Sequence, residues 1–254
     1  MTRANIDSPL SELSTASAGM SAKPTATVLY GSVLDELGTA ITSGVLKEGD
    51  IVTLDQLQQR FAVSRTIARE VMRILESMNL VESRRRVGLV VQKASKWLVF
   101  DSRIIRWRID GPDRFAQLHS LTELRVVVEP AAAAAAARNA TAEERERIVH
   151  LAALMRETGE AEELETFLQL DIEFHALILH ASGNEMFAAL TDMVVEVLAG
   201  RTHHGLMPSS PVSEALDAHE QIARAIFDGD ENLAESAMKF ATTEVRQALR
   251  DGEY

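Results

Sequence analysis

Three arginines recur at helical spacing between Phe61 and Leu75, where they could contact phosphate groups. At about 100° per residue, Arg65, Arg69 and Arg73 fall within roughly 80° of one another on a helix. One face would present guanidinium groups, which suits phosphate and base edges in a DNA major groove. A surface helix with no partner would show the same pattern. The apolar residues lie on the opposite side: Ile67, Val71, Ile74, Leu75 and Met78.

The flanking residues favour a DNA-binding helix over a bare surface helix. Residues 55–61 can form a short helix, residues 62–63 a turn, and Ser64 the N-cap of the arginine-bearing helix. A basic second helix after a tight turn is typical of a helix-turn-helix. Two short strands predicted within 80–91 would form a wing, with Gly88 supplying a permissive backbone. The candidate DNA-contacting residues are Ser64, Arg65, Thr66, Arg69, Arg73, Arg84, Arg85, Arg86 and Gly88.

A second set of ionisable residues lies where helices should be apolar. Asp171 and His175 are four residues apart and share a helical face, and His219 lies in the apolar stripe of another helix. Burying an unpaired carboxylate is costly, so these groups need partners. An Asp-x-x-x-His pair with a distant histidine is ordinary geometry for a divalent metal such as zinc, manganese or nickel. The alternative is an Asp171–His175 salt bridge, with His219 bonded to a backbone carbonyl.

Arg125 and Glu129 form a further polar pair among apolar residues. Arg125 is the candidate effector-binding residue, because a guanidinium binds a ligand carboxylate bidentately; the alternative is a pair with Glu129 one turn along the helix.

A metal with an open position also activates water. A metal-dependent hydrolase or lyase using Asp171, His175 and His219 is therefore the alternative function. The sequence has no phosphate-binding glycine loop, nucleophile elbow or His-Glu-x-x-His motif.

The charge of the chain is unevenly distributed. The formal net charge is −12, but residues 1–95 carry +1 and residues 96–254 carry −13. Because local charge governs phosphate contact, the acidic second part does not exclude DNA binding by the first. The absence of cysteine excludes disulfides and thiolate metal sites and fits a cytoplasmic location. We expect no membrane segment and no secretion signal, since the longest apolar run, Ala131–Ala137, is too short to span a bilayer.

A mainly α framework in two domains would position these residues. We expect a flexible N-terminal arm over 1–25, a winged helix-turn-helix domain over 26–93, and an all-α helical bundle over 94–254. A helix at about 26–43 begins the first domain. Apolar periodicity, with breaks at glycine, proline and capping residues, predicts seven helices in the second: about 95–107, 113–138, 141–158, 160–181, 184–204, 211–228 and 231–250.

Taken over both halves, the chain resembles the GntR superfamily of bacterial transcription regulators. It is most similar to the FadR-like branch, which has an all-helical FCD effector domain. The matching positions in the first half are Ile41-Thr-Ser-Gly44, Gly49, Val63-Ser-Arg65, Arg69-Glu70, Leu75, Leu80-Val81 and Gly88. Those in the second half are Glu123-Leu-Arg125, Glu129, Asp171-x-x-Phe-His175, His219 and Gly229-Asp230. Residues 97–101 and 105–107 resemble regulators of sugar-acid catabolism.

The resemblance implies a homodimer that binds a palindromic double-stranded DNA operator, as a repressor or an activator. An organic acid effector, here an aldonate, would bind the FCD domain and change operator affinity. Asp171, His175 and His219 stand at three positions that usually bind metal in this family. Two departures matter: Asp55 stands where many relatives have arginine, and Ala241 stands where the fourth metal ligand is usually histidine. A three-ligand site completed by water or effector, and a metal-free effector pocket, are both compatible with these residues.

Overall fold

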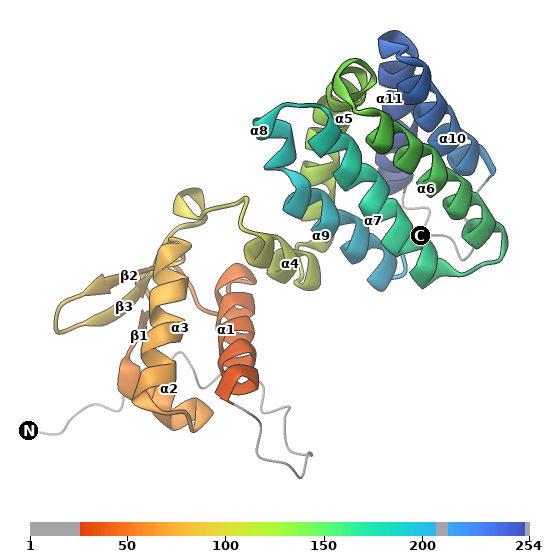
Figure 1. The fold of residues 1–254 in the computed structure, drawn as a ribbon. Coiled ribbons are helices and arrows are strands. Elements are labelled where there is room, and N and C mark those ends of the chain that lie inside the picture. The colour runs from red at the N-terminus through yellow and green to blue at the C-terminus, as the bar shows by residue number, and fades with distance from the viewer. Residues whose placement is uncertain (1–25, 207–212, 252–254) are drawn as a thin grey trace, which may run out of the picture. The chain divides into compact units, whose positions relative to one another are not determined.

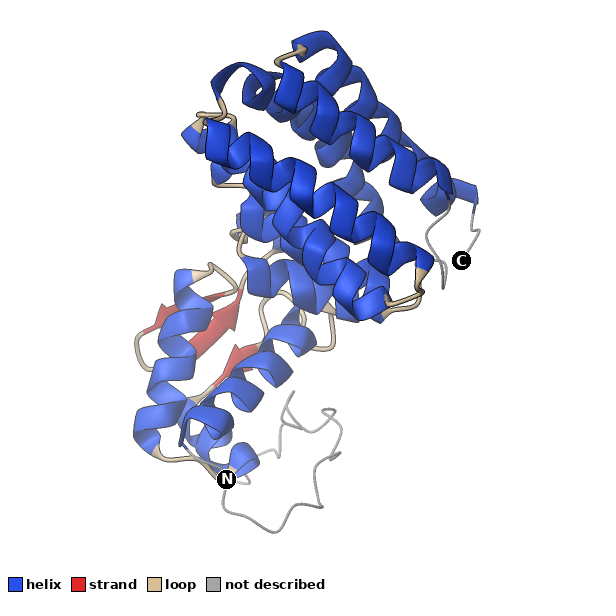
Figure 2. Cartoon of the chain, turned by 45° about the vertical axis from the view of Figure 1, so that its right-hand side comes forward, coloured by secondary structure: helices blue, strands red, loops and turns tan. Residues whose placement is uncertain are grey.

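The computed structural model describes residues 26–206 and 213–251, with side chains described for 30–206 and 213–246, and divides into two compact units (Figure 1). The first unit ends at Asp113 and the second begins at Arg114. Helices dominate both units, and the strands belong to the first (Figure 2). The mainly α fold class is confirmed. The expected N-terminal arm lies outside the described residues, and no helix of the described part is long and apolar enough to cross a membrane.

The first unit contains a three-stranded antiparallel sheet with strand order β1-β3-β2. The register pairs Val81 with Val91 and Arg84 with Gly88. Strand β1 was not predicted, because two residues are too few to show an alternating pattern. The elements are α1 (Ala26–Thr42), β1 (Ile51–Val52), α2 (Leu54–Phe61), α3 (Arg65–Ser77), β2 (Val81–Arg84), β3 (Gly88–Val91), a 3-10 turn (Ala94–Lys96) and α4 (Ser102–Asp110).

Capping interactions set the tight turn between α2 and α3. Thr53 and Gln56 form a capping box that begins α2. Ala62 ends α2 in the left-handed conformation, with φ at 52°. The Ser64 hydroxyl then accepts a hydrogen bond from the Ile67 amide at 3.3 Å and begins α3. The helix-turn-helix predicted from the sequence is confirmed.

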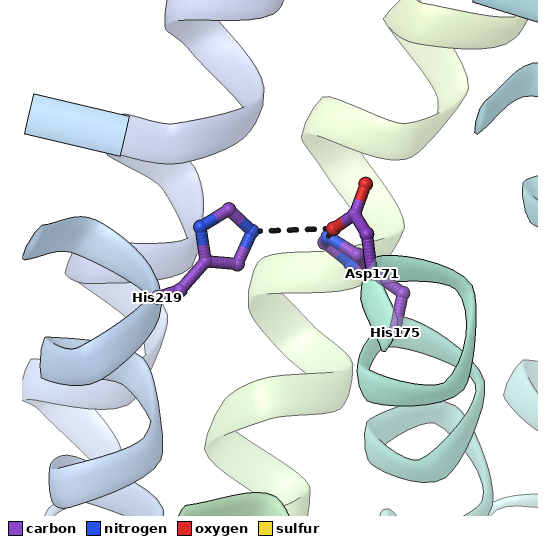
Figure 3. A group of neighbouring side chains, drawn as sticks. All are labelled: Asp171, His175 and His219. Carbon is purple, nitrogen blue, oxygen red and sulfur yellow. Dashed lines mark ion pairs between the residues drawn. The ribbon is translucent and has the colours of Figure 1, made fainter. Parts of the chain in front are cut away.

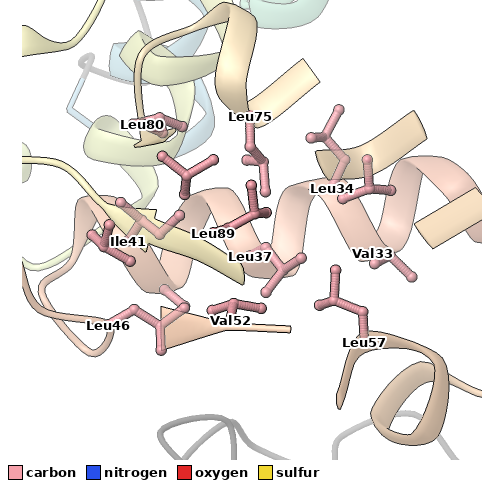
Figure 4. Close-up of a cluster of buried hydrophobic side chains, with 14 of the residues drawn as sticks. Val33, Leu34, Leu37, Ile41, Leu46, Val52, Leu57, Leu75, Leu80 and Leu89 are labelled. Atoms are coloured by element: carbon pink, nitrogen blue, oxygen red, sulfur yellow. The ribbon is translucent and has the colours of Figure 1, made fainter. Parts of the chain in front are cut away.

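The apolar side of α3 packs into the core of the first unit (Figure 4). Val71, Leu75 and Met78 are buried, whereas Ile67 and Ile74 are partly buried against the same core. Burial of this stripe fixes which side of α3 faces outward, so the arginines are left on the exposed side. The core side chains labelled in Figure 4 are Val33, Leu34, Leu37, Ile41, Leu46, Val52, Leu57, Leu75, Leu80 and Leu89.

The single helix predicted over 95–107 is wrong. The Trp97 indole donates to the Gln92 carbonyl at 3.0 Å, and the Leu98 amide donates to the Met78 carbonyl at 3.0 Å. These bonds hold residues 97–98 out of a helix. Helix α4 begins only after Asp101, whose side chain accepts a hydrogen bond from the Arg103 amide.

Helix α4 packs against α1 within the first unit, although the sequence placed residues from 94 onward in the second domain. A Cβ at Gly38 would come within 2.4 Å of the Trp107 ring, so only glycine allows this approach. The Trp107 indole donates to Asp35 at 3.0 Å. Trp107 is 2% exposed and thereby anchors α4 to the first unit.

The second unit is a bundle in which α5 packs most extensively against α11, and α6 contacts both α7 and α10. The helix predicted over 184–204 is divided at Ala189–Leu190 into two helices. Glu162, with φ at 59°, turns the chain before α7. The elements are α5 (Arg114–Asn139), α6 (Ala142–Glu160), α7 (Leu164–Ala181), α8 (Glu185–Ala188), α9 (Thr191–His203), α10 (Ser213–Asp228) and α11 (Glu231–Asp251).

The Arg145 guanidinium joins the C-terminal ends of α5 and α10. It donates to the carbonyls of Ala137 and Ala140 at 2.6 and 3.1 Å, and to that of Phe227 at 3.1 Å. The carbonyl of Ile226 is a further acceptor. The last carbonyls of a helix have no partner inside the helix, so one side chain here satisfies two helix ends.

Candidate functional site

The arginines of α3 differ in their surroundings. Arg65, Arg69 and Arg73 are all exposed, as the periodicity predicted. Arg73 lies 3.4 Å from Glu70 in an ion pair. Arg65 and Arg69 make no ion pair among the residues whose side chains are described. Two guanidinium groups of the predicted recognition helix are therefore free to contact an anion, whereas the third is partly neutralised.

The strands β2 and β3 form the predicted wing, and its tip is basic. Arg84, Arg85 and Arg86 are exposed, and Arg84 lies 3.2 Å from Glu82. Arg86 adopts the left-handed conformation, with φ at 64°. Gly88 has φ at 129°, and a Cβ there would come within 2.9 Å of the Val52 carbonyl oxygen. Glycine at this position lets β1 approach β3 behind the basic tip.

In the second unit, the predicted metal ligands converge from two helices. Asp171 and His175 come from α7 and His219 from α10, and one donor atom from each lies within 4.8 Å of the others (Figure 3). The Nε2 atoms of His175 and His219 each lie 3.3 Å from Asp171 Oδ1. All three side chains are buried or nearly so. The convergence that the spacing predicted is present.

The other ring nitrogen of each histidine faces an acceptor. The Nδ1 of His219 lies 2.6 Å from the Ala215 carbonyl oxygen, and the Nδ1 of His175 lies 2.7 Å from Glu129 Oε2. An acceptor at Nδ1 favours a proton on that nitrogen, so a metal that displaces the Nε2 proton would be bound through Nε2. Both contacts of the alternative to a metal site, the Asp171–His175 ion pair and the His219–carbonyl bond, are therefore present, and the second also orients Nε2 of His219 toward Asp171.

Arg125 and Glu129 on α5 adjoin this cluster. The Arg125 Nη2 lies 3.2 Å from Glu129 Oε2, and its Nε also donates to the Glu129 carboxylate. Both side chains are about 2% exposed. The pairing one turn along the helix, which was the alternative for Arg125, is thus present. Proximity of Glu129 to His175 was not predicted, since it depends on how α5 packs against α7.

Charge alternates along the cluster from Arg125 through Glu129 and His175 to Asp171. Burial alone would lower the pKa of His175, but the carboxylates of Glu129 and Asp171 outweigh burial and raise it to about 9. Burial would raise the pKa of Glu129, but Arg125 and His175 bring it down to about 2. Burial opposes ionisation of Asp171 as well, yet the two imidazoles lower its pKa. Each buried charge therefore has a partner of opposite sign.

The three ligand residues fit a divalent cation. Donors bound to one zinc ion at about 2.0–2.1 Å with tetrahedral angles lie about 3.3 Å apart, which matches both Asp171–histidine separations. Asp171 Oδ1 is buried and makes no hydrogen bond to any described residue, although two nitrogens are close. Such an oxygen favours a cation between the three side chains. Ala241, at the usual position of a fourth ligand, offers no donor atom.

Comparison with known proteins identifies both units. Residues 29–91 match the bacterial regulatory proteins of the gntR family, and residues 120–240 match the FCD domain. The chain belongs to the GntR family of regulators with an FCD domain. The galactonate operon transcriptional repressor of Escherichia coli K12 is 28% identical over 79% of this chain and 88% of its own length. The Exu regulon transcriptional regulator of the same strain is 26% identical over 83% of this chain and 80% of its own.

A solved structure shows the same fold. Lar, which controls the expression of the Listeria monocytogenes agr system, superposes with a TM-score of 0.56 at 18% identity, covering 91% of this chain and 99% of Lar. Because the matched family and the named relatives are transcription regulators, this GntR regulator is a DNA-binding transcription regulator and not an enzyme. The alternative of a metal-dependent hydrolase or lyase finds no support, because the matched family and the named relatives are regulators.

Proposed function

We propose that this GntR regulator is a ligand-responsive repressor of an operon for the catabolism of a carbohydrate acid or another organic acid. It acts as a cytoplasmic homodimer on a palindromic operator. The buried Asp171–His175–His219 cluster carries the proposal, since its donor atoms converge and Asp171 Oδ1 makes no hydrogen bond to any described residue. The similarity to a galactonate operon repressor supports an aldonate as the effector.

The proposed operator surface combines α3 with the wing. Arg65 and Arg69 contact bases and phosphates, with Ser64 and Thr66 at the exposed start of the same helix. The hydroxyl of Ser64 already caps α3, so its contact to DNA would be to phosphate beside the helix N-terminus. The wing residues Arg84, Arg85 and Arg86 contact the phosphate backbone.

The proposed effector site combines the metal ligands with Arg125. Asp171, His175 and His219 would hold zinc, manganese or nickel, and a bound metal would supply a Lewis acid for oxygen ligands. With Ala241 in place of a fourth protein ligand, oxygens of an aldonate or water complete the coordination. A guanidinium has five N–H donors, so Arg125 keeps donors for the effector carboxylate beside those that Glu129 uses.

The chain connects the two sites through one helix. Arg125 and Glu129 lie on α5, which follows α4 after only residues 111–113. Helix α4 is anchored to the winged helix-turn-helix by Trp107. A displacement of α5 on effector binding would therefore be transmitted along the chain through α4 to the winged helix-turn-helix. Couplings of this kind are worth about 1–3 kcal/mol, or about 5–150-fold in affinity.

Arginine substitutions test the operator surface. Replacing Arg65 or Arg69 by alanine should weaken binding to the DNA upstream of the regulator's own gene by about 1–3 kcal/mol, since each loses a base or phosphate contact. Arg73→Ala is the matched control, because its charge is shared with Glu70 and the expected loss is smaller. Fluorescence anisotropy at fixed salt measures all three. Unchanged affinity of both Arg65→Ala and Arg69→Ala would refute the assignment.

A further inference from the structure

The position of Glu129 indicates a role beyond packing. Its Oε2 lies 2.7 Å from His175 Nδ1, while His175 Nε2 faces Asp171 on the other side of the ring. Glu129 is therefore behind the histidine and outside the group of potential metal ligands. The contact has the geometry of an ion pair and not of a hydrogen bond, but a carboxylate this close favours a proton on Nδ1 over a lone pair, because two lone pairs would repel.

The Arg125 guanidinium fixes the Glu129 carboxylate from the opposite side. The guanidinium contacts both carboxylate oxygens, and Oε2 is shared between Arg125 Nη2 at 3.2 Å and His175 Nδ1. Bidentate pairs of this kind fix the carboxylate plane as well as its charge. Since both side chains are about 2% exposed, water does not replace either partner. His175 therefore has a carboxylate at each nitrogen: the rigidly held Glu129 at Nδ1, and at Nε2 Asp171, which is itself a candidate metal ligand.

We propose that Glu129, held in place by Arg125, is a positioning residue that keeps the His175 proton on Nδ1 and presents Nε2 to the metal. The inference rests on the metal site of the proposed function. It assigns to Arg125 a part in building the site, in addition to effector contact. His219 is positioned independently through the Ala215 carbonyl, so the two histidines differ in what orients them.

Glu129→Gln tests the proposal in the full chain. The amide can donate to Nδ1 and so favours the wrong tautomer. Zinc affinity, measured by competition titration, should fall about 10–100-fold, the usual cost of losing the group that orients a ligand histidine. Glu129→Asp keeps a carboxylate and should recover part of the affinity. Glu123→Gln is the matched control, because that carboxylate lies on the same helix but is partly exposed near Arg246.

The histidine tautomers provide a readout that a merely structural role would not change. In the zinc-loaded protein, ¹⁵N-resolved NMR should show Nδ1–H for both His175 and His219, and Glu129→Gln should change His175 alone. Unchanged zinc affinity in Glu129→Gln, zinc bound through His175 Nδ1, or absence of zinc binding by the unmodified chain would each overturn the inference. If Glu129→Gln does not fold, zinc affinity and the His175 tautomer are measured on Glu129→Asp instead, and unchanged values of both would overturn the inference. None of these measurements depends on operator binding, so a failure of the proposed DNA-binding function is detected separately, by fluorescence anisotropy.

Discussion

At the scale of single residues, the Arg125–Glu129 pair shows how burial determines the effect of a substitution. Both groups are buried, and Glu129 also contacts His175. The pKa of Glu129, about 2, shows that its partners outweigh the cost of burial. Removing only the cation leaves a buried carboxylate with one partner fewer, whereas removing both charges leaves none unpaired on α5.

Arg125→Met should therefore lower the free energy of unfolding by about 3–5 kcal/mol. In Arg125→Met/Glu129→Leu, most of that loss should be recovered, because the remaining side chains are apolar and of similar volume. Denaturant unfolding of the metal-free protein measures both. A double variant as unstable as the single one would show that the pair contributes mainly through packing.

At the scale of elements, the contact between α1 and α4 depends on one glycine. Gly38→Ala places a methyl group within 2.4 Å of the Trp107 ring, and both helices are packed around it. The expected destabilisation is about 1–3 kcal/mol, as for other overpacked cores. Gly31→Ala is the control on the same helix, because nothing lies within 4 Å of its Cβ. That substitution should raise stability by about 0.5–1 kcal/mol. Equal melting temperatures for the two variants would contradict the packing account.

The bridge made by Arg145 is a second prediction about elements. Arg145→Met removes the donor from carbonyls at the ends of both α5 and α10, and should cost about 1–3 kcal/mol. Arg147→Met is the control, since Arg147 forms an exposed ion pair with Glu173 worth less than about 1 kcal/mol. Thermal unfolding compares the two. A loss no larger for Arg145→Met than for Arg147→Met would show that water satisfies these helix ends.

Local patterns in the sequence were sufficient to predict most helices and the orientation of α3. The period of apolar residues placed the arginines outside, and the spacing of Asp171 and His175 placed both on one face. Contacts between elements were harder to predict. Strand β1 is too short to show a pattern, and the end of the helix predicted at 95–107 depends on Trp97 bonding to Gln92. Glu129 reaches His175 only through the packing of α5 against α7, which periodicity does not encode.

At the scale of the whole molecule, one chain carries a winged helix-turn-helix and an FCD domain of opposite charge character. The formal net charge of −12 belongs mainly to residues 96–254, so we expect affinity for DNA to depend on the exposed arginines of α3 and the wing rather than on overall charge. Under the proposed function, the effector must bind the operator-bound and released states of the protein with different affinity. The proposed metal ligands and Arg125 lie on helices of the second unit, and the arginines of the proposed operator surface lie in the first.

The most direct test of this account is operator affinity as a function of effector. Anisotropy of labelled upstream DNA should be measured with the zinc-loaded and the chelator-treated full chain, with galactonate and with other sugar acids. We predict that an acid of this class weakens binding by about 5–150-fold when zinc is present, and much less after chelation. DNA binding that no sugar acid changes in either metal state would contradict the account.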